Sequence, residues 1–101
     1  MIVVRDIFRL KFGKAKEATA LWKQAMELLK RNGFGPGGIR LLTDLAGESF
    51  YTLVLESAYD SLTKWEQMHD TMKGNKDWKT VYDKITALTE SGRREILSVI
   101  E

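Results

Sequence analysis

The sequence predicts an α+β fold with a four-stranded antiparallel sheet, and three observations lead to this prediction. Residues 2–12 alternate in the manner of a strand. Two longer stretches, 14–32 and 60–91, repeat apolar residues at helical spacing, and the second is interrupted in its middle. Two short segments rich in branched and aromatic residues, 39–45 and 50–56, are joined by a connection of hairpin length.

The first strand, 2–12, has apolar residues on both of its sides. One side carries a run of them: Ile2, Val4, Phe8, Leu10 and Phe12. The other side carries Val3 and Ile7 among charged residues. A strand that is apolar on both faces is typical of a sheet that is covered on both sides.

The first helix is amphipathic and extends from Lys14 to Asn32, and Gly33 stands where a left-handed residue commonly ends a helix. The glycine-rich segment 33–38 that follows contains the single proline, so we expect a loop. This loop follows a helix and leads into a strand. It therefore lacks the strand-to-helix context of a phosphate-binding loop.

The second helical region begins after an N-cap at Asp60 or Ser61 and is broken at residues 73–75. Its second piece starts near Asp77, and we expect it to end at Ser91 and Gly92. The remaining apolar run, 93–100, predicts the last strand.

Composition limits the classes of function. The chain has 101 residues, which we take as one domain, 1–101, and its charge of +2 arises from 16 basic and 14 acidic residues spread along it. Because the positive and negative charges nearly balance, the composition predicts neither nucleic acid nor a membrane surface as a partner. The chain has no cysteine, no segment resembling a signal peptide and no apolar run long enough to cross a membrane. We therefore expect a cytoplasmic protein.

The order strand, helix, strand, strand, broken helix, strand is that of the ferredoxin-like unit. In this topology the first and third strands are central, and both right-handed crossovers place their helices on one face of the sheet. The other face is left bare. Four strands of about eight residues expose on the order of 500 Å² of sheet, and burying even half of this area would contribute several kcal/mol at about 25 cal/mol per Å². We therefore expect a homodimer in which two sheets pack face to face.

Three segments resemble the dimeric α/β-barrel superfamily, and within it the NIPSNAP-like and antibiotic-biosynthesis-monooxygenase-like small proteins. They are 11–15 (Lys-Phe-Gly-Lys-Ala) before the long helix, 56–66 with its Ser-Ala-Tyr-Asp-Ser-Leu run into Trp-Glu, and the Asp-Trp pair 77–78. Phe12 stands where a proline is common in such chains. The resemblance implies a homodimeric barrel with a small-molecule cleft between sheet and helices. Many relatives have no assigned reaction, others oxidise polycyclic aromatics without a cofactor, and some bind or degrade haem.

His69 is the only histidine, so it is the only side chain with an ordinary pKa suited to a general base near neutral pH. Its spacing from Trp65 and Met72 turns it toward the apolar side of its helix. An isolated histidine in such a place is also commonly a hydrogen-bonded structural residue. The pair Glu66 and His69 has the spacing of a di-iron ligand pair, but a di-iron site needs two such pairs, so we predict no metal centre. Two alternatives for the cofactor stay open: no cofactor at all, or haem with His69 as its axial ligand.

Four aromatic residues, Trp22, Trp65, Trp78 and Tyr82, fall on the inward faces of the predicted helices. Side chains of this kind most often fill a core between helices and a sheet. As a set they would also form the walls of a flat hydrophobic pocket, because ligand sites are mostly apolar with a few polar groups.

Asp6 is the most informative polar residue because it falls on the otherwise apolar side of the first strand. If buried it needs a partner, for which Arg40 and Arg94 are the candidates on neighbouring strands. Asp6 would then act as a base or an orienting carboxylate, and Arg40 would help to orient a substrate, although a plain ion pair on the sheet explains Asp6 equally well. Tyr51 could present its hydroxyl to the same cleft.

Two functions are compatible with these residues. The first is an enzyme, a cofactor-independent or haem-linked monooxygenase or a related isomerase, that acts on a hydrophobic, aromatic small molecule with His69 as base or ligand. The second is a non-catalytic homodimeric ligand-binding or scaffold module in which the aromatic residues are simply core.

Overall fold

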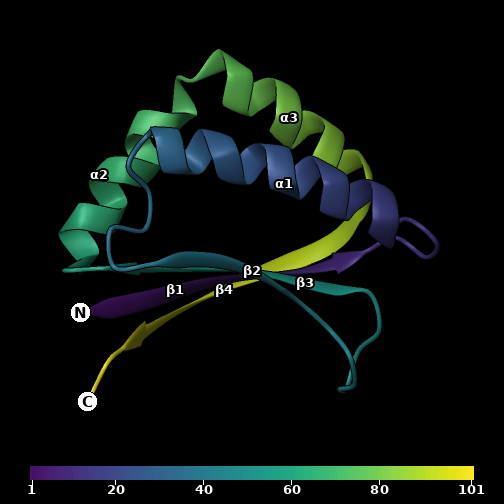
Figure 1. Ribbon diagram of the computed structural model, residues 1–101, viewed down its shortest axis with the longest axis horizontal. Helices are drawn as coiled ribbons and strands as arrows, with labels where there is room; N and C mark the ends of the chain where they lie inside the picture. Colours follow the sequence, from purple (N-terminus) through teal and green to yellow (C-terminus); the bar gives the residue numbers. More distant parts are fainter.

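The structure is a computed structural model that describes residues 1–101, and it has two layers: a four-stranded sheet and three helices on one of its faces (Figure 1). Along the chain the elements are β1 (Ile2–Leu10), α1 (Ala15–Arg31), β2 (Ile39–Thr43), β3 (Thr52–Tyr59), α2 (Leu62–Lys73), α3 (Lys76–Ala87) and β4 (Thr89–Ser98). The predicted element order and the ferredoxin-like α+β class are confirmed. None of the three helices combines the length and the apolar character that crossing a membrane requires.

The strands follow the spatial order β2-β3-β1-β4, and every neighbouring pair is antiparallel. The first and third strands are therefore central, as the topology predicts. In this register Asp6 lies opposite Leu55 of β3 and opposite Arg94 of β4. The register thus brings one acidic and one basic side chain together on the face that the helices cover.

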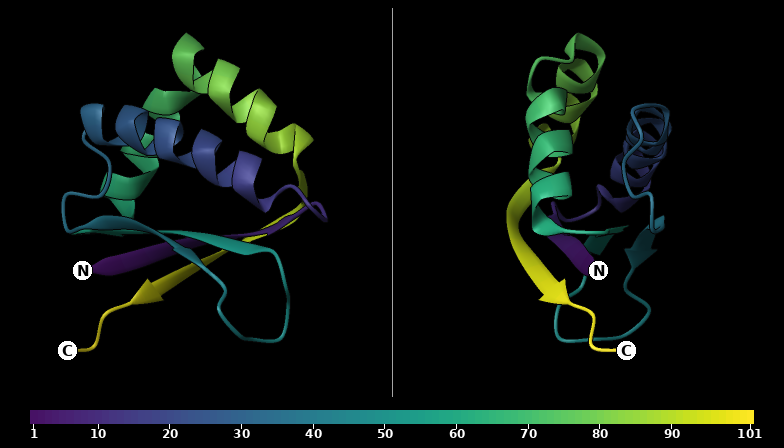
Figure 2. Two further views of the ribbon diagram at one scale, coloured as in Figure 1. Left: turned by 45° about the vertical axis from the view of Figure 1, so that its right-hand side comes forward. Right: turned by 90° about the vertical axis from the view of Figure 1, so that its left-hand side faces the viewer.

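The two halves of the broken helix have separate caps. The Ser61 hydroxyl accepts a hydrogen bond from the backbone N–H of Lys64 at the start of α2, and the Asn75 side chain accepts one from the N–H of Trp78 at the start of α3. The break between the two helices turns the chain, so that α3 lies beside α1 above the sheet (Figure 2). This bend directs side chains from three helices toward the same region above β1.

The end of β1 and both limits of β3 differ from those predicted. Lys11 leaves β1 for a turn in which the N–H of Lys14 bonds to its carbonyl, and Phe12 is consequently 85% exposed in that turn. Phe50 also lies outside the sheet, because β3 starts only at Thr52 and then continues to Tyr59, opposite Ile2. The prediction that β3 ends at residue 56 is therefore wrong.

The sequence predicts that Gly92 ends the second helical region. The structure instead places Gly92 inside β4, opposite Phe8. A Cβ atom at Gly92 would come within 2.9 Å of Phe8 Cδ1, so the Phe8 ring lies against the glycine backbone. Glycine is needed here because any side chain would occupy the space of this ring.

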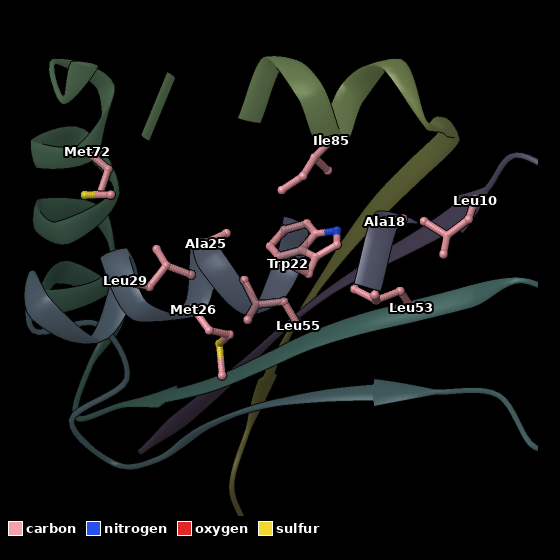
Figure 3. Packing of buried hydrophobic residues seen from close by; sticks show 10 residues of the cluster. All are labelled: Leu10, Ala18, Trp22, Ala25, Met26, Leu29, Leu53, Leu55, Met72 and Ile85. Atoms are coloured by element: carbon pink, nitrogen blue, oxygen red, sulfur yellow. The ribbon is translucent and has the colours of Figure 1, made fainter. Parts of the chain in front are cut away.

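The core lies between α1, α3 and the sheet, with Trp22 near its centre (Figure 3). Trp22 is 1% exposed, and the Phe8 ring packs against it with 5.1 Å between ring centroids. The buried cluster consists of Leu10, Ala18, Trp22, Ala25, Met26, Leu29, Leu53, Leu55, Met72 and Ile85. Burial of this size is the main favourable contribution to folding.

The opposite face of the sheet is not covered by any helix (Figure 2). It combines apolar side chains with a charged group in which Glu56 accepts hydrogen bonds from Arg5 at 2.8 Å and from Arg40 at 2.6 Å. Leu97 on the same face is 45% exposed. Within the chain, β1 is thus covered on one side only, and no element of this chain provides the second cover expected from its sequence.

Candidate functional site

A cavity of about 200 Å³ lies between the helices and the face of the sheet that they cover. Fifteen residues line it, and ten of them are hydrophobic. They come from β1, α1, the loop before β2, β3, α2, α3 and β4: Asp6, Phe8, Trp22, Leu29, Phe34, Leu55, Ser57, Tyr59, Trp65, His69, Met72, Lys73, Trp78, Tyr82 and Arg94. An apolar wall with a few converging polar groups is typical of small-molecule sites.

The aromatic residues of this wall are arranged in pairs. Trp78 stacks on Tyr82, one helical turn further along α3, with 5.4 Å between ring centroids. Trp65 stacks in the same way on His69 of α2 at 5.0 Å. With Trp22 on α1, all three tryptophans of the chain therefore line one cavity. Flat apolar surfaces of this kind suit an aromatic ring, which packs favourably by offset stacking.

His69 is half-buried on the cavity side of α2, and its pKa is lowered from the ordinary value. Burial is the largest cause, because it disfavours the charged imidazolium, and the positive charges of Arg94 and Lys73 add to it. Asp70 and Asp6 act in the opposite direction but do not cancel the shift. At neutral pH His69 is therefore an uncharged imidazole that can accept a proton.

Asp6 is the acidic residue of the cavity wall, and its partner is Arg94. The Arg94 Nε donates a hydrogen bond to Asp6 Oδ1 at 2.5 Å, and the Asp6 side chain is 15% exposed. The Arg94 guanidinium also lies over the Trp65 ring, 4.9 Å from its centroid, in a cation–π contact. The ion pair thus connects β1 and β4 to the aromatic wall contributed by α2.

Ser57 and Tyr59 form a buried polar end of the cavity on β3. Burial raises the pKa of Tyr59, although hydrogen bonds from the Ser57 hydroxyl and from the backbone N–H of Gly35 act against this rise. Tyr59 is therefore a neutral phenol at physiological pH. These residues were missed from the sequence because we expected the strand to stop at residue 56; Leu53, Leu55, Ser57 and Tyr59 continue a single alternating face and could have revealed them.

Six of the eight residues proposed from the sequence line this cavity: Asp6, Trp22, Trp65, His69, Trp78 and Tyr82. Arg40 does not, because it belongs to the uncovered face of the sheet, where it bonds to Glu56. Tyr51 does not either. It immediately precedes β3 with a positive φ of 58°, and its ring packs against Phe12 at 5.2 Å.

Arg94 is thus the arginine of the site, and Arg40 is not. Both lie on strands next to a central one, so their positions in the sequence did not distinguish them. The antiparallel register decides the matter, because it places Arg94 opposite Asp6 and Arg40 opposite Glu56.

Haem does not fit this cavity. An apolar cavity of about 150 Å³ holds benzene, and a macrocycle of four pyrrole rings is several times larger than benzene, whereas the cavity measures about 200 Å³. No group of three or more histidine or carboxylate side chains comes together as a metal site.

The fold is shared with several solved structures. An uncharacterized NIPSNAP-domain protein from Burkholderia xenovorans superposes with a TM-score of 0.85 at 17% identity, over 98% of this chain and 94% of that one. The chain therefore shares its fold with NIPSNAP-domain proteins. A putative antibiotic biosynthesis monooxygenase from Nitrosomonas europaea gives a TM-score of 0.74 at 16% identity, with full coverage of both chains. A cofactor-independent oxygenase from Streptomyces nogalater gives 0.73 at 11%, over 99% of this chain and 93% of that one.

The resemblance found in the sequence is confirmed at the level of the fold, in which NIPSNAP proteins and antibiotic-biosynthesis-monooxygenase proteins share one architecture with this chain. Neither a family model nor a curated protein matches the sequence itself. With identities below one fifth, the choice of reaction has to rest on the residues of the cavity.

Proposed function

We propose that this protein binds a hydrophobic aromatic small molecule of one or two rings in the cavity and catalyses a reaction that begins with removal of a proton from it. The observation that supports this most directly is an uncharged His69 in the wall of an aromatic cavity of about 200 Å³. Because about 150 Å³ suffices for benzene, there is room for two fused rings but not for a large polycycle.

The chemistry follows from the charges around His69. A substrate C–H or O–H bond would give its proton to the imidazole, and the electron pair would remain in the ring system as a delocalised anion. The Arg94 guanidinium would stabilise that anion, because a preorganised positive group is most effective where charge develops in the transition state. Burial keeps His69 deprotonated and ready to accept the proton.

Two outcomes of this first step correspond to the two enzyme classes. In an isomerase, the imidazolium returns the proton at another carbon. In an oxygenase, dioxygen is the oxidant: it adds to the carbanion to give a peroxide anion, which takes the proton back from His69. The oxygenase is favoured by the shared fold of the cofactor-independent oxygenase from Streptomyces nogalater.

A non-catalytic ligand-binding module is the second candidate, and one observation favours it. The His69 ring is stacked on Trp65, and no carboxylate or carbonyl hydrogen-bonds to it to fix its orientation. A catalytic histidine commonly has such an orienting group. In the binding module, His69 and Trp65 would together simply form a flat wall.

A homodimer is part of the same proposal. The uncovered face of the sheet exposes Leu97 beside the Arg5, Glu56 and Arg40 group, and packing two such faces together would bury the apolar side chains of both copies. Light scattering tests this directly. A mass equal to that of one chain over the whole concentration range would reject the dimer, and with it the second cover of β1.

A cytoplasmic location remains a proposal that rests on the absence of cysteine.

Deuterium exchange separates the two candidate functions. We suggest 2-tetralone as the probe, because it has two rings and acidic C–H groups, and loss of its C1 proton signal in D₂O is followed by NMR. The enzyme hypothesis predicts exchange faster than in buffer, a loss of that excess in His69→Gln, and full retention in Lys79→Gln, whose side chain is exposed on α3 and pairs with Asp83. Binding of 2-tetralone without faster exchange would select the non-catalytic module.

A further inference from the structure

Arg94 is held in a fixed orientation but keeps donors available for a ligand. Its Nε donates to Asp6, and Trp65 covers one face of its guanidinium at 4.9 Å. A guanidinium carries five N–H donors, so even a second hydrogen bond to Asp6 would leave three. A guanidinium that is already oriented loses little entropy on binding a carboxylate, and its planar shape suits two-point binding.

Arg94 also stands where the cavity opens. A second, more polar groove of about 430 Å³ lies between α3 and β4, and it shares Asp6, Phe8, Tyr82 and Arg94 with the cavity. Its remaining lining includes the hydroxyl residues Thr86, Thr89 and Ser91. A ring placed in the cavity can therefore direct a polar substituent past Tyr82 toward Arg94 and the groove.

The groove lowers the cost of binding a charged substituent. A fully buried anion would lose its hydration, and this loss can exceed what an ion pair gains. The Arg94 side chain is 40% exposed, so an anion bound to its outer N–H groups would keep part of its water on the groove side. The apolar ring and the charged group of one molecule would thus each lie in surroundings that suit them.

The charges at this end of the cavity also favour an anion. Lys73 is the second cation in the wall, and it pairs with Asp70 at 3.0 Å outside the cavity. At His69 each of the two cations, Arg94 and Lys73, lowers the pKa by more than either carboxylate, Asp70 or Asp6, raises it. The local potential is therefore positive in spite of the two carboxylates.

We propose that the natural ligand is an aromatic mono-anion, with its ring in the cavity and a carboxylate bound to the outer N–H groups of Arg94 at the opening to the groove. This inference rests on the proposed aromatic ligand and adds its charge and its orientation. It also makes Arg94 a binding residue, whereas the sequence suggested it only as a possible partner of Asp6.

Calorimetric titration with two probes of the same ring system tests the proposal: 2-naphthoate, which is an anion, and 2-naphthalenemethanol, which is neutral. Naphthoate should bind at least about tenfold more tightly, as expected for charge-assisted hydrogen bonds. Equal affinities would overturn the anionic ligand and leave the aromatic cavity intact. If neither probe binds, the proposed function fails together with this inference.

Three variants assign the effect to Arg94. Arg94→Gln should weaken naphthoate to the affinity of the alcohol and leave the alcohol unchanged, while Lys79→Gln, which removes the same charge from a residue that lines neither the cavity nor the groove, should change neither. Because Arg94→Gln leaves Asp6 without its partner and could destabilise the fold, Asp6→Asn provides an independent reading. Its amide oxygen can still accept the hydrogen bond that orients Arg94, but the competing negative charge is gone, so Asp6→Asn should strengthen naphthoate binding. Naphthoate affinity that is unchanged or weaker in Asp6→Asn would contradict the role of Arg94.

Discussion

Gly92 connects the sheet to the shape of the cavity, and its replacement by alanine tests that connection. The new Cβ atom would lie 2.9 Å from Cδ1 and 3.2 Å from Cε1 of Phe8. Carbon atoms in favourable contact are at least about 3.5 Å apart, so the Phe8 ring has to move by roughly 0.6 Å. On its other side the ring meets Trp22 at a centroid distance of 5.1 Å, which leaves the cavity as the space into which it can shift.

The expected magnitude follows from two opposing contributions. Inserting a methyl group into a packed site costs about 1–3 kcal/mol, while replacing glycine inside a strand recovers about 0.5–1 kcal/mol of backbone entropy. Gly92→Ala should therefore lower the free energy of unfolding by about 1 kcal/mol, within the range of about 0–2.5 kcal/mol that these two contributions span, and reduce the affinity for 2-naphthoate, because Phe8 enters the cavity. Urea unfolding followed by tryptophan fluorescence measures the first quantity, and calorimetric titration measures the second.

Gly74→Ala is the matched control. A Cβ atom at Gly74 would meet no atom within 4 Å, and its φ of −93° is accessible to alanine. This variant should gain about 0.4–1 kcal/mol from a less flexible unfolded chain and should bind naphthoate normally. If Gly92→Ala behaves like this control, Phe8 does not form the wall that we describe and the argument about cavity shape is wrong.

Three further predictions concern protonation and helix capping. Because the pKa of His69 is lowered in the folded protein, the unfolded chain binds the proton more readily. The contribution of His69 to stability should therefore be fully present above about pH 6.5 and decline as the pH falls toward the lower pKa of the folded state. His69→Gln should abolish this part of the pH profile in urea unfolding. The pKa of Glu56 is lowered in the folded protein chiefly by its hydrogen bond from Arg40. The contribution of Glu56 to stability is therefore present above its ordinary pKa of 4.5 and is lost as the pH falls through its pKa in the folded state. Glu56→Gln should remove this decline in urea unfolding. Asn75→Ala removes the cap of α3 and should lower the free energy of unfolding by about 1 kcal/mol, measured by thermal or urea unfolding. Asn75→Asp keeps a capping oxygen and should retain most of this stability, so equal losses in the two variants would argue against the cap.

The sequence was sufficient for the fold because the two periodicities are clear. Alternation in β1 and helical spacing in α1 gave the element order, and Gly33, with a φ of 81°, ends the first helix as expected. The errors arise where a local signal competes with pairing. Gly92 looked like a helix end, but it pairs with Phe8 inside β4 because the ring needs the space of a missing side chain.

The candidate site was partly predictable for the same reasons. His69 and Trp65 were found because they share one face of α2, and Trp78 was found because it falls on the inward face of α3. The sequence did not show which of Arg94 and Arg40 belongs to the cavity. The answer depends on the register of the antiparallel strands, and neither arginine fixes that register by itself. Tyr59 was lost because the length of a strand is set by its partner, here the first residues of β1.

The two ends of the chain leave the sheet at the same end of its strands, where the N–H of Val99 bonds to the carbonyl of Met1 at 3.0 Å (Figure 1). The pairing of β1 with β4 thus closes the longest loop in the molecule, and in a folding chain such closure comes with a high entropic cost. A short linker between the ends, with new termini opened in the connection between β2 and β3, would make this pairing local. That connection contributes no residue to the cavity. Such a circular permutant should fold faster than the natural chain and bind the same ligands, so the order of the strands along the chain determines how quickly the cavity forms but not what it holds.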